Sequence, residues 1–108
     1  MDGISHHYYT IPSGQWEHKG AALGFPEQEW FSTLFRTLKM RGILTSNGRV
    51  LNELDPKKKV GFVLDEWGTW YDTPEGASPS ALYQQNSLRD AVLAALNRME
   101  GTAGIVVL

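Results

Sequence analysis

The pattern of apolar and polar residues predicts two strands, which are separated along the chain by helical segments. Residues 4–10 mix β-branched and aromatic side chains between Gly3 and Pro12, which favours a short strand. Residues 60–67 form a nearly continuous apolar run, as is typical of a parallel strand that is buried on both faces. Residues 104–108 can supply a third strand.

A first long helix is predicted from apolar side chains that recur at helical spacing. It runs from Pro26 to Arg41 with Gly42 as its stop. Its apolar stripe consists of Trp30, Phe31, Leu34, Phe35 and Leu38. A short helix can follow, with inward side chains at Val50, Leu51 and Leu54. The preceding residues 11–25 hold three glycines and no apolar period, so we expect a long loop there.

A second long helix is predicted over Leu82 to Met99. Arg89 and Asp90 lie off its apolar face, which consists of Leu88, Val92, Ala95, Leu96 and Met99. The element order is therefore β, α, α, β, α, and such alternation indicates a parallel sheet with crossover helices. We expect one α/β domain that spans residues 1–108.

Composition narrows the class of protein. A formal net charge of −2 provides no basic surface for nucleic acid. No apolar run approaches the roughly 18 residues of a membrane-spanning helix, and the polar start of the chain lacks the apolar core of a signal peptide. The absence of cysteine fits a reducing compartment. We therefore expect a cytoplasmic protein with no nucleic-acid partner and no membrane anchor.

The polar residues that could carry chemistry stand where the two strands end. Ligands of parallel α/β folds bind beyond the carboxyl ends of the strands. The first strand ends in His6-His7-Tyr8-Tyr9, and the second in Asp65-Glu66-Trp67-Gly68-Thr69-Trp70-Tyr71. An ionised carboxylate is costly to bury without partners. Glu66 therefore either points into a site or simply ends its strand at a solvated loop.

Strict alternation along each strand predicts which side chains share a face. It places Glu66 beside Phe62 and Leu64, with Asp65 on the opposite face. It also places His7 and Tyr9 on one face of the first strand.

Neither a metal ion nor a cofactor is predicted. Adjacent residues on a strand diverge, so His6 and His7 do not form a metal site, and no Asp, Glu or Cys stands at ligand spacing. The 4 Trp, 4 Tyr and 4 Phe residues can fill a core or stack on the C–H faces of a sugar. Core filling is the more usual of the two roles.

The second strand and its continuation form a specific motif. It reads Val60-Gly61-Phe62-Val63-Leu64-Asp65-Glu66-Trp67-Gly68-Thr69-Trp70-Tyr71-Asp72, followed by Leu82-Tyr83-Gln84-Gln85-Asn86-Ser87-Leu88-Arg89-Asp90-Ala91. This string resembles the α-L-arabinofuranosidases of glycoside hydrolase family 51. So do His7-Tyr8-Tyr9-Thr10, Trp16-Glu17-His18-Lys19-Gly20 and Glu29-Trp30-Phe31. The resemblance runs from about Asp2 to Asn97, and residues 98–108 look unrelated.

The resemblance implies a fold and a reaction. The fold is a partial (β/α)8 TIM-barrel arc with two or three parallel strands and two long helices. The reaction is the removal of arabinofuranosyl groups from arabinan and other arabinose-containing hemicellulose oligosaccharides, with retention of configuration. Glu66 then matches the nucleophile at the end of the seventh barrel strand. His7 and Tyr9 match site-lining residues at the end of the sixth, and Tyr9 is a suitable hydrogen-bond donor to Glu66.

Three tryptophans complete the expected binding site, namely Trp16, Trp67 and Trp70, although Trp67 could equally be a packing residue. The general acid/base is not found. A retaining mechanism needs a second carboxyl group ~5–5.5 Å from the nucleophile, in an Asn-Glu pair at a strand end in this family. The one Asn-Glu dipeptide, Asn52-Glu53, falls in the short helix.

Two interpretations therefore remain open. The chain is either an enzyme whose proton donor is Glu17, Asp72, Glu75 or a residue of a second copy, or an inactive barrel fragment with at most weak carbohydrate binding. A barrel of this kind takes ~250 residues. In a fragment the edge strands of the sheet lack a hydrogen-bonded neighbour, so we also expect self-association through these edges.

Overall fold

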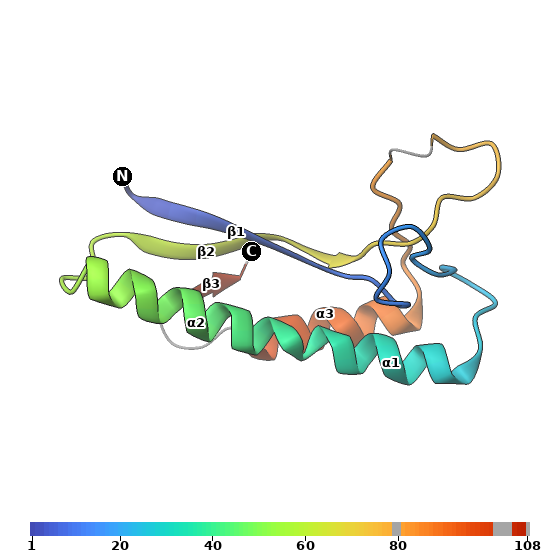
Figure 1. The fold of residues 1–108 in the computed structure, drawn as a ribbon, viewed down its shortest axis with the longest axis horizontal. Helices are drawn as coiled ribbons and strands as arrows, with labels where there is room; N and C mark the ends of the chain where they lie inside the picture. The colour runs from blue at the N-terminus through green and yellow to red at the C-terminus, as the bar shows by residue number, and fades with distance from the viewer. Residues whose placement is uncertain (79–80, 101–104, 108) are drawn as a thin grey trace.

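The structure, a computed structural model, describes residues 1–78, 81–100 and 105–107. The elements follow the chain as β1 (Gly3–Thr10), α1 (Glu27–Thr37), α2 (Lys39–Leu54), β2 (Gly61–Thr69), α3 (Leu88–Glu100) and β3 (Ile105–Val107). Figure 1 shows the helices gathered on one side of the sheet, while no described helix covers its other face. We refer to that other side as the open face.

The sheet is parallel, with strand order β1-β2-β3. β1 pairs with β2 along its whole length, from Gly3 opposite Gly61 to Thr10 opposite Thr69. β3 pairs with the short stretch from Phe62 to Leu64. The α/β class and the third strand are thus confirmed over Ile105–Val107, whereas Gly104 and Leu108 lie outside the described residues.

A bulge interrupts the pairing of β1 with β2. His6 lies opposite Leu64, but the next residue, His7, lies opposite Glu66, so Asp65 is an extra residue in β2. An extra residue shifts the alternation of every side chain that follows it. Strict alternation was therefore the wrong expectation: Glu66 does not share a face with Phe62 and Leu64. Both apolar residues are buried, whereas Glu66 is exposed.

The first helical segment is longer than predicted. α2 continues through Gly42 to Leu54, and Leu38 between α1 and α2 keeps right-handed helical angles (φ −63°, ψ −16°). The two helices follow one another as a nearly continuous rod (Figure 1). Gly42 is not a stop because the turns around it are held by packing: Met40 and Leu44 join the core with sheet residues.

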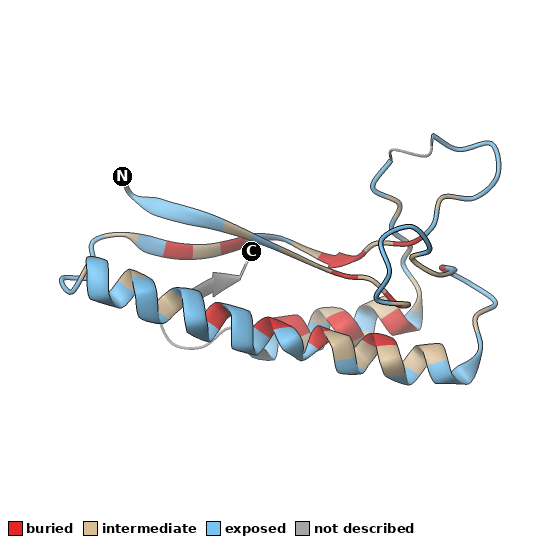
Figure 2. Cartoon of the chain, viewed as in Figure 1, coloured by how far each residue is buried: buried red, intermediate tan, exposed pale blue. Residues whose placement is uncertain are grey.

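The inward face of α1 differs from the predicted stripe. Its buried residues are Thr33 and Thr37, while Phe31 and Phe35 are 62% and 70% exposed. The small threonines let the helix lie close to β1, where the hydroxyls of Thr37 and Thr10 are hydrogen-bonded at 3.1 Å. Figure 2 shows the buried stretches of the helices on the side that faces the sheet and exposed stretches on the far side. In the following α2, Val50 and Leu54 are also exposed, and of the three predicted inward residues only Leu51 packs against the core.

α3 begins later than predicted and turns a different face inward. Ser87 and Asp90 form a capping box that sets its start: Ser87 N donates to Asp90 Oδ2 (3.0 Å) and Asp90 N to Ser87 Oγ (3.3 Å). Residues 82–87 precede it, with Tyr83 bridged to Tyr71. The buried side chains of α3 are Arg89, Leu93 and Asn97, whereas the predicted Leu88 and Met99 are exposed.

One hydrophobic core cluster lies between α2 and the sheet. It consists of Met40, Leu44, Phe62 and Leu64, with Tyr8, Leu51 and Trp67 packed against it. It therefore joins α2 to β1 and β2 and leaves the open face free for polar side chains. Within the described ranges, no helix is long and apolar enough to cross a membrane.

Candidate active site

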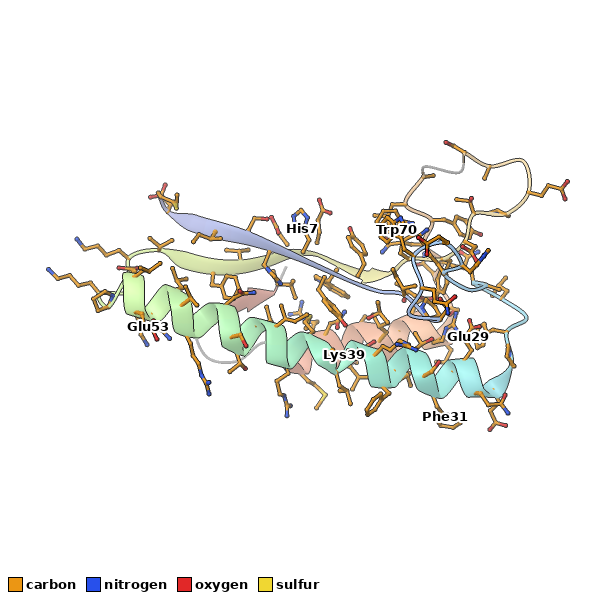
Figure 3. All side chains as sticks on the ribbon, viewed as in Figure 1. His7, Glu29, Phe31, Lys39, Glu53 and Trp70 are labelled. Carbon is orange, nitrogen blue, oxygen red and sulfur yellow. The ribbon has the colours of Figure 1, made fainter. Side chains whose placement is uncertain are left out.

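A polar cluster occupies the open face where β1 and β2 run side by side. Tyr9 donates its hydroxyl hydrogen to Glu66 Oε2 at 2.9 Å. His7 Nδ1 lies 3.4 Å from the same oxygen. The labelled His7 points away from the helices (Figure 3). The structure thus brings together Glu66, the predicted nucleophile, and its two predicted neighbours, His7 and Tyr9.

Asp65 joins this cluster because of the bulge. Ser5 donates its hydroxyl hydrogen to Asp65 Oδ1 at 2.7 Å, and His7 Nε2 lies 3.4 Å from that oxygen. The imidazole of His7 therefore stands between two carboxylates. The hydrogen bond from Ser5 is the main reason that the pKa of Asp65 lies below its ordinary value. Asp65 is consequently an ionised group at neutral pH and a poor proton donor.

Tyr9 is held in its protonated form. Burial and then the contact with Glu66 raise the pKa of its phenol, because a phenolate beside a carboxylate would be repelled. A neutral phenol can donate to Glu66 and so stabilises the ionised carboxylate. The Glu66 side chain is 52% exposed. The carboxylate is accordingly accessible to a ligand, as a nucleophile must be.

An aromatic wall extends from this cluster. The ring of Trp70 contacts Tyr9 edge to face at a centroid distance of 5.6 Å. The Trp16 ring contacts the Trp70 ring edge to face at a centroid distance of 4.9 Å, and Lys19 Nζ lies 4.7 Å from the centroid of the Trp16 ring. Figure 3 places Trp70 on the same side of the sheet as His7. Of the predicted tryptophans, Trp16 and Trp70 therefore lie next to the Glu66 cluster.

Asp72 attaches the loop of residues 11–25 to this wall. Its two carboxylate oxygens accept the backbone N–H groups of Lys19 (2.9 Å) and Gly20 (3.0 Å). Burial on its own would raise the pKa of Asp72, but these backbone donors outweigh it and the pKa lies below its ordinary value. Both of its oxygens are thus engaged in holding the loop that carries Trp16.

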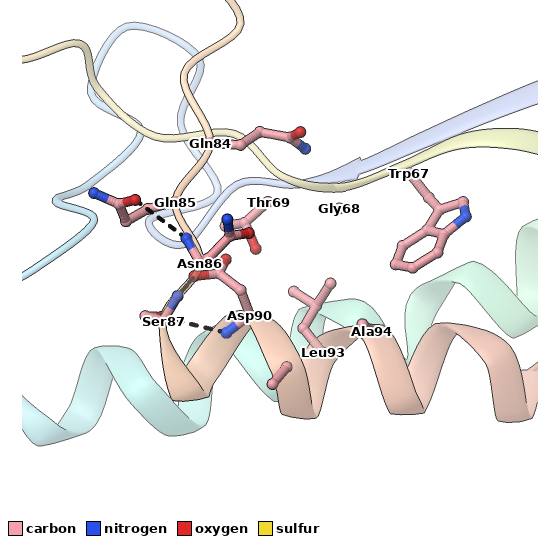
Figure 4. Close-up of a pocket in the computed structure, with 11 residues that line it drawn as sticks. Trp67, Gly68, Thr69, Gln84, Gln85, Asn86, Ser87, Asp90, Leu93 and Ala94 are labelled. Atoms are coloured by element: carbon pink, nitrogen blue, oxygen red, sulfur yellow. Dashed lines mark hydrogen bonds between the residues drawn. The ribbon is translucent and has the colours of Figure 1, made fainter.

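Trp67 lies apart from the cluster. It packs against the core on the helix side of the sheet, together with Tyr8 and Leu51. It therefore occupies a packing position, the second of the two roles open to it. Its ring also borders a hollow of about 410 Å³ between the end of β2 and α3, which Gln84 and Asn86 help to line (Figure 4). Neither Glu66, His7 nor Tyr9 lines this hollow.

Sequence reasoning missed Ser5 in the polar cluster and Lys19 beside the aromatic wall. The alternation that paired His7 with Tyr9 extends back to Ser5, so that signal was present in the sequence. The position of Lys19 depends on a loop without periodicity, and no pattern could have found it. In the part of the chain that the structure describes, no group of His, Cys, Asp and Glu side chains has the arrangement of a metal site.

The comparisons with known proteins bear on this cluster. The family described as the α-L-arabinofuranosidase C-terminal domain matches residues 65–106. The intracellular exo-α-L-arabinofuranosidase of Bacteroides ovatus is 40% identical over 97 residues. The crystal structure of the family 51 arabinofuranosidase from Xanthomonas axonopodis pv. citri matches 99% of this chain, with a TM-score of 0.83 and 44% identity. The chain is related to the family 51 arabinofuranosidases.

The chain corresponds to a small part of those arabinofuranosidases. The match covers 90% of this chain but 19% of the Bacteroides ovatus protein, and 23% of the Xanthomonas axonopodis chain. The chain thus spans about a fifth of the length of the curated relative. The family match also corrects the view that residues 98–108 are unrelated, because it extends to residue 106.

Proposed function

We propose that the open-face cluster is the nucleophile half of a retaining α-L-arabinofuranosidase site, with Glu66 as the nucleophile. The observation that carries this proposal is the hydrogen bond from Tyr9 to Glu66 on an exposed face, with His7 beside the same oxygen. A retaining glycosidase needs an ionised, oriented carboxylate that a sugar can reach.

The chemistry of the first step follows from this geometry. An oxygen of Glu66 forms a bond to the anomeric carbon while the bond to the leaving oxygen breaks, and the leaving oxygen takes the electron pair. Tyr9 remains protonated and keeps the carboxylate in position until attack. His7 lies where it can donate to the sugar or to the carboxylate. The product of this step is a glycosyl ester on Glu66, which water then cleaves.

The proton donor for the leaving group is the missing part. Asp65 and Asp72 have lowered pKa values, so both are ionised and unsuited to donate. Glu17 and Glu75 lie exposed in loops, and neither has a described contact with Glu66. We therefore propose that residues 1–108 form one domain that corresponds to an arc of a (β/α)8 barrel, with the acid/base contributed from elsewhere. On its own the chain would then bind sugar weakly and turn over ordinary substrates very slowly.

The aromatic wall supports an arabinofuranosyl group as the ligand. Trp70 and Trp16 offer apolar faces of the kind that stack on sugar C–H groups, and they border the nucleophile. The relatives are named as arabinofuranosidases, which favours arabinose-containing oligosaccharides of the arabinan or arabinoxylan type. The name of the Bacteroides ovatus relative also supports an intracellular location. With a net charge of −2, we propose no nucleic-acid partner.

We also propose that the chain self-associates through its sheet edges. Among the described strands, β1 has a partner on one side only, and four of its eight residues are exposed. Unpaired strand edges are templates for pairing with another chain. Sedimentation velocity over a range of protein concentrations tests this. A monomer at every concentration would contradict it.

The nucleophile can be tested without a proton donor. A dinitrophenyl arabinofuranoside has a leaving group that departs unprotonated, so it should glycosylate Glu66 even where the acid/base is missing. Intact-protein mass spectrometry should then show one added anhydropentosyl group, located on Glu66 by peptide mapping. Glu66→Gln should abolish the adduct, whereas the matched Glu53→Gln variant on α2 should keep it. Labelling of another residue, or none at all, would contradict the assignment.

A further inference from the structure

A charged side chain is fully buried at the end of the domain that carries the aromatic wall. Arg89 is 0% exposed. Its guanidinium stacks on the Phe25 ring, with Cζ 3.5 Å from the centroid, and lies 5.0 Å from the ring of Tyr71. Burying a guanidinium is costly unless it is paired and hydrogen-bonded. Arg89 therefore has to make polar contacts that an apolar residue could not make.

The partners of Arg89 come from different segments. Its Nη1 lies 3.3 Å from Glu29 Oε1 on α1, and its Nη2 donates to the carbonyl of Ala21 at 2.9 Å. Ala21 and Phe25 belong to the loop that carries Trp16. Arg89 thus ties α3 to α1, to that loop and to the residue that follows Trp70.

Both tryptophans of the wall depend on segments that Arg89 holds. Trp70 is followed directly by Tyr71, over which the guanidinium lies and whose hydroxyl donates to Asp90 at 2.6 Å. Trp16 lies in the loop of residues 11–25. Asp72 accepts hydrogen bonds from the backbone N–H groups of Lys19 and Gly20 in this loop, and Arg89 donates to the carbonyl of Ala21. The loop of residues 11–25 and the segment after β2 meet where the two indole rings contact each other, at a centroid distance of 4.9 Å.

We infer that Arg89 is a positioning residue that sets Trp16 against Trp70 and so shapes the sugar-stacking wall beside Glu66. It acts through the loop and Tyr71, and it touches neither indole itself. The inference about sugar binding rests on the proposed function, but the indole geometry can be measured without any sugar. A lysine could keep the charge, but it cannot stack as a plane or donate in two fixed directions.

The test uses the coupled absorption of the two indoles. Edge-to-face tryptophans in contact give an exciton couplet in the far-ultraviolet circular dichroism spectrum, and Trp16→Phe should remove it. Arg89→Lys should remove most of the couplet while cooperative unfolding persists. Because that variant can fail to fold, Glu29→Gln serves as a milder second variant, which weakens one partner of Arg89 and should reduce the couplet in part.

A matched control separates positioning from general loss of stability. Leu44 is also buried, but it lies on α2 and packs with Met40, Phe62 and Leu64. Leu44→Ala should lower the melting temperature and leave the couplet intact. An unchanged couplet in folded Arg89→Lys and Glu29→Gln, or an equal loss in Leu44→Ala, would overturn the inference.

The sugar arm uses arabinose itself as the probe. Arabinose should quench the tryptophan fluorescence, and the arabinose concentration that gives half of the full quenching should be roughly tenfold higher in Arg89→Lys than in the wild type. Absence of quenching in the wild type would count against the proposed function, whereas the couplet would still decide the role of Arg89.

Discussion

Tyr9 and Glu66 are joined by a 2.9 Å hydrogen bond across two neighbouring parallel strands. The bulge at Asp65 makes this bond possible, since it turns Glu66 from the face of Leu64 to the open face. Bulges are common beside active sites because they redirect a side chain without ending the strand. The proposed nucleophile therefore owes its direction to one extra residue.

Replacing Tyr9 with Phe should slow the glycosylation of Glu66 by about 10- to 100-fold. A hydrogen bond to a charged group contributes about 1.5–3 kcal/mol, and about 1.4 kcal/mol corresponds to a tenfold change in rate. Stability should change little, since the pair is exposed. The rate of adduct formation with a dinitrophenyl arabinofuranoside measures the effect.

Tyr8→Phe is the matched control for that change. Tyr8 lies on the opposite face of β1 and donates its hydroxyl hydrogen to the Arg36 carbonyl. It should lose some stability and keep the glycosylation rate. A rate that falls equally in both variants would show that the Tyr9 hydroxyl has no particular role.

The titration of Tyr9 should respond to Glu66. Burial and the neighbouring carboxylate raise the pKa of the Tyr9 phenol. Glu66→Gln removes the negative charge, so the pKa of Tyr9 should move down towards its ordinary value. Nuclear magnetic resonance of ring-labelled tyrosine, assigned with Tyr9→Phe, follows this shift. Tyr71, whose pKa is raised by burial and by Asp90, should titrate as before and serves as the internal reference.

Asp90 should make the fold sensitive to acid. Burial alone would raise its pKa, but hydrogen bonds from Ser87 and Tyr71 outweigh burial and lower the pKa below 3.8. The lowered value means that Asp90 stabilises the folded state above the pKa of the unfolded chain. This contribution is lost as the pH falls through the folded pKa. Unfolding by urea at about pH 6 and about pH 3 should therefore show a smaller acid-induced loss in Asp90→Asn than in the wild type.

At neutral pH, Asp90→Asn should itself cost roughly 1 kcal/mol, since it weakens the capping box of α3. Glu53→Gln, at the exposed end of α2, should leave the acid response unchanged. If Asp90→Asn loses as much stability in acid as the wild type, another group is responsible.

Truncation to alanine should lower the free energy of unfolding far more at Leu64 in β2 than at Phe35 in α1. Leu64 is 0% exposed, so Leu64→Ala should cost about 2–5 kcal/mol of unfolding free energy. Phe35 is 70% exposed, so Phe35→Ala should stay within about 0.5 kcal/mol. Urea unfolding at low protein concentration measures both. A large cost for Phe35→Ala would mean that another chain covers α1 in solution.

Much of the site could be predicted from the sequence, and its errors have physical causes. Glu66, His7 and Tyr9 were named from the family resemblance, and the structure brings them together because the ends of neighbouring parallel strands meet at one edge of a sheet. The face of Glu66 was predicted wrongly because a bulge leaves no periodic signal. The burial of Arg89 and the exposure of Phe31 were also missed. Hydrophobic periodicity shows that a helix has an apolar face but not which neighbour it meets.

The sequence by itself determined the order of strands and helices, the acidic strand end and the relationship to the arabinofuranosidases, because these depend on local composition and on motifs. Only the tertiary structure decided that Glu66 meets Tyr9 on the open face, that threonines rather than phenylalanines pack α1 against the sheet, and that Arg89 stacks on Phe25. The reason is that side-chain direction depends on pairing register and on close contacts between segments far apart in the chain, such as β1 with β2 and α3 with the loop of residues 11–25.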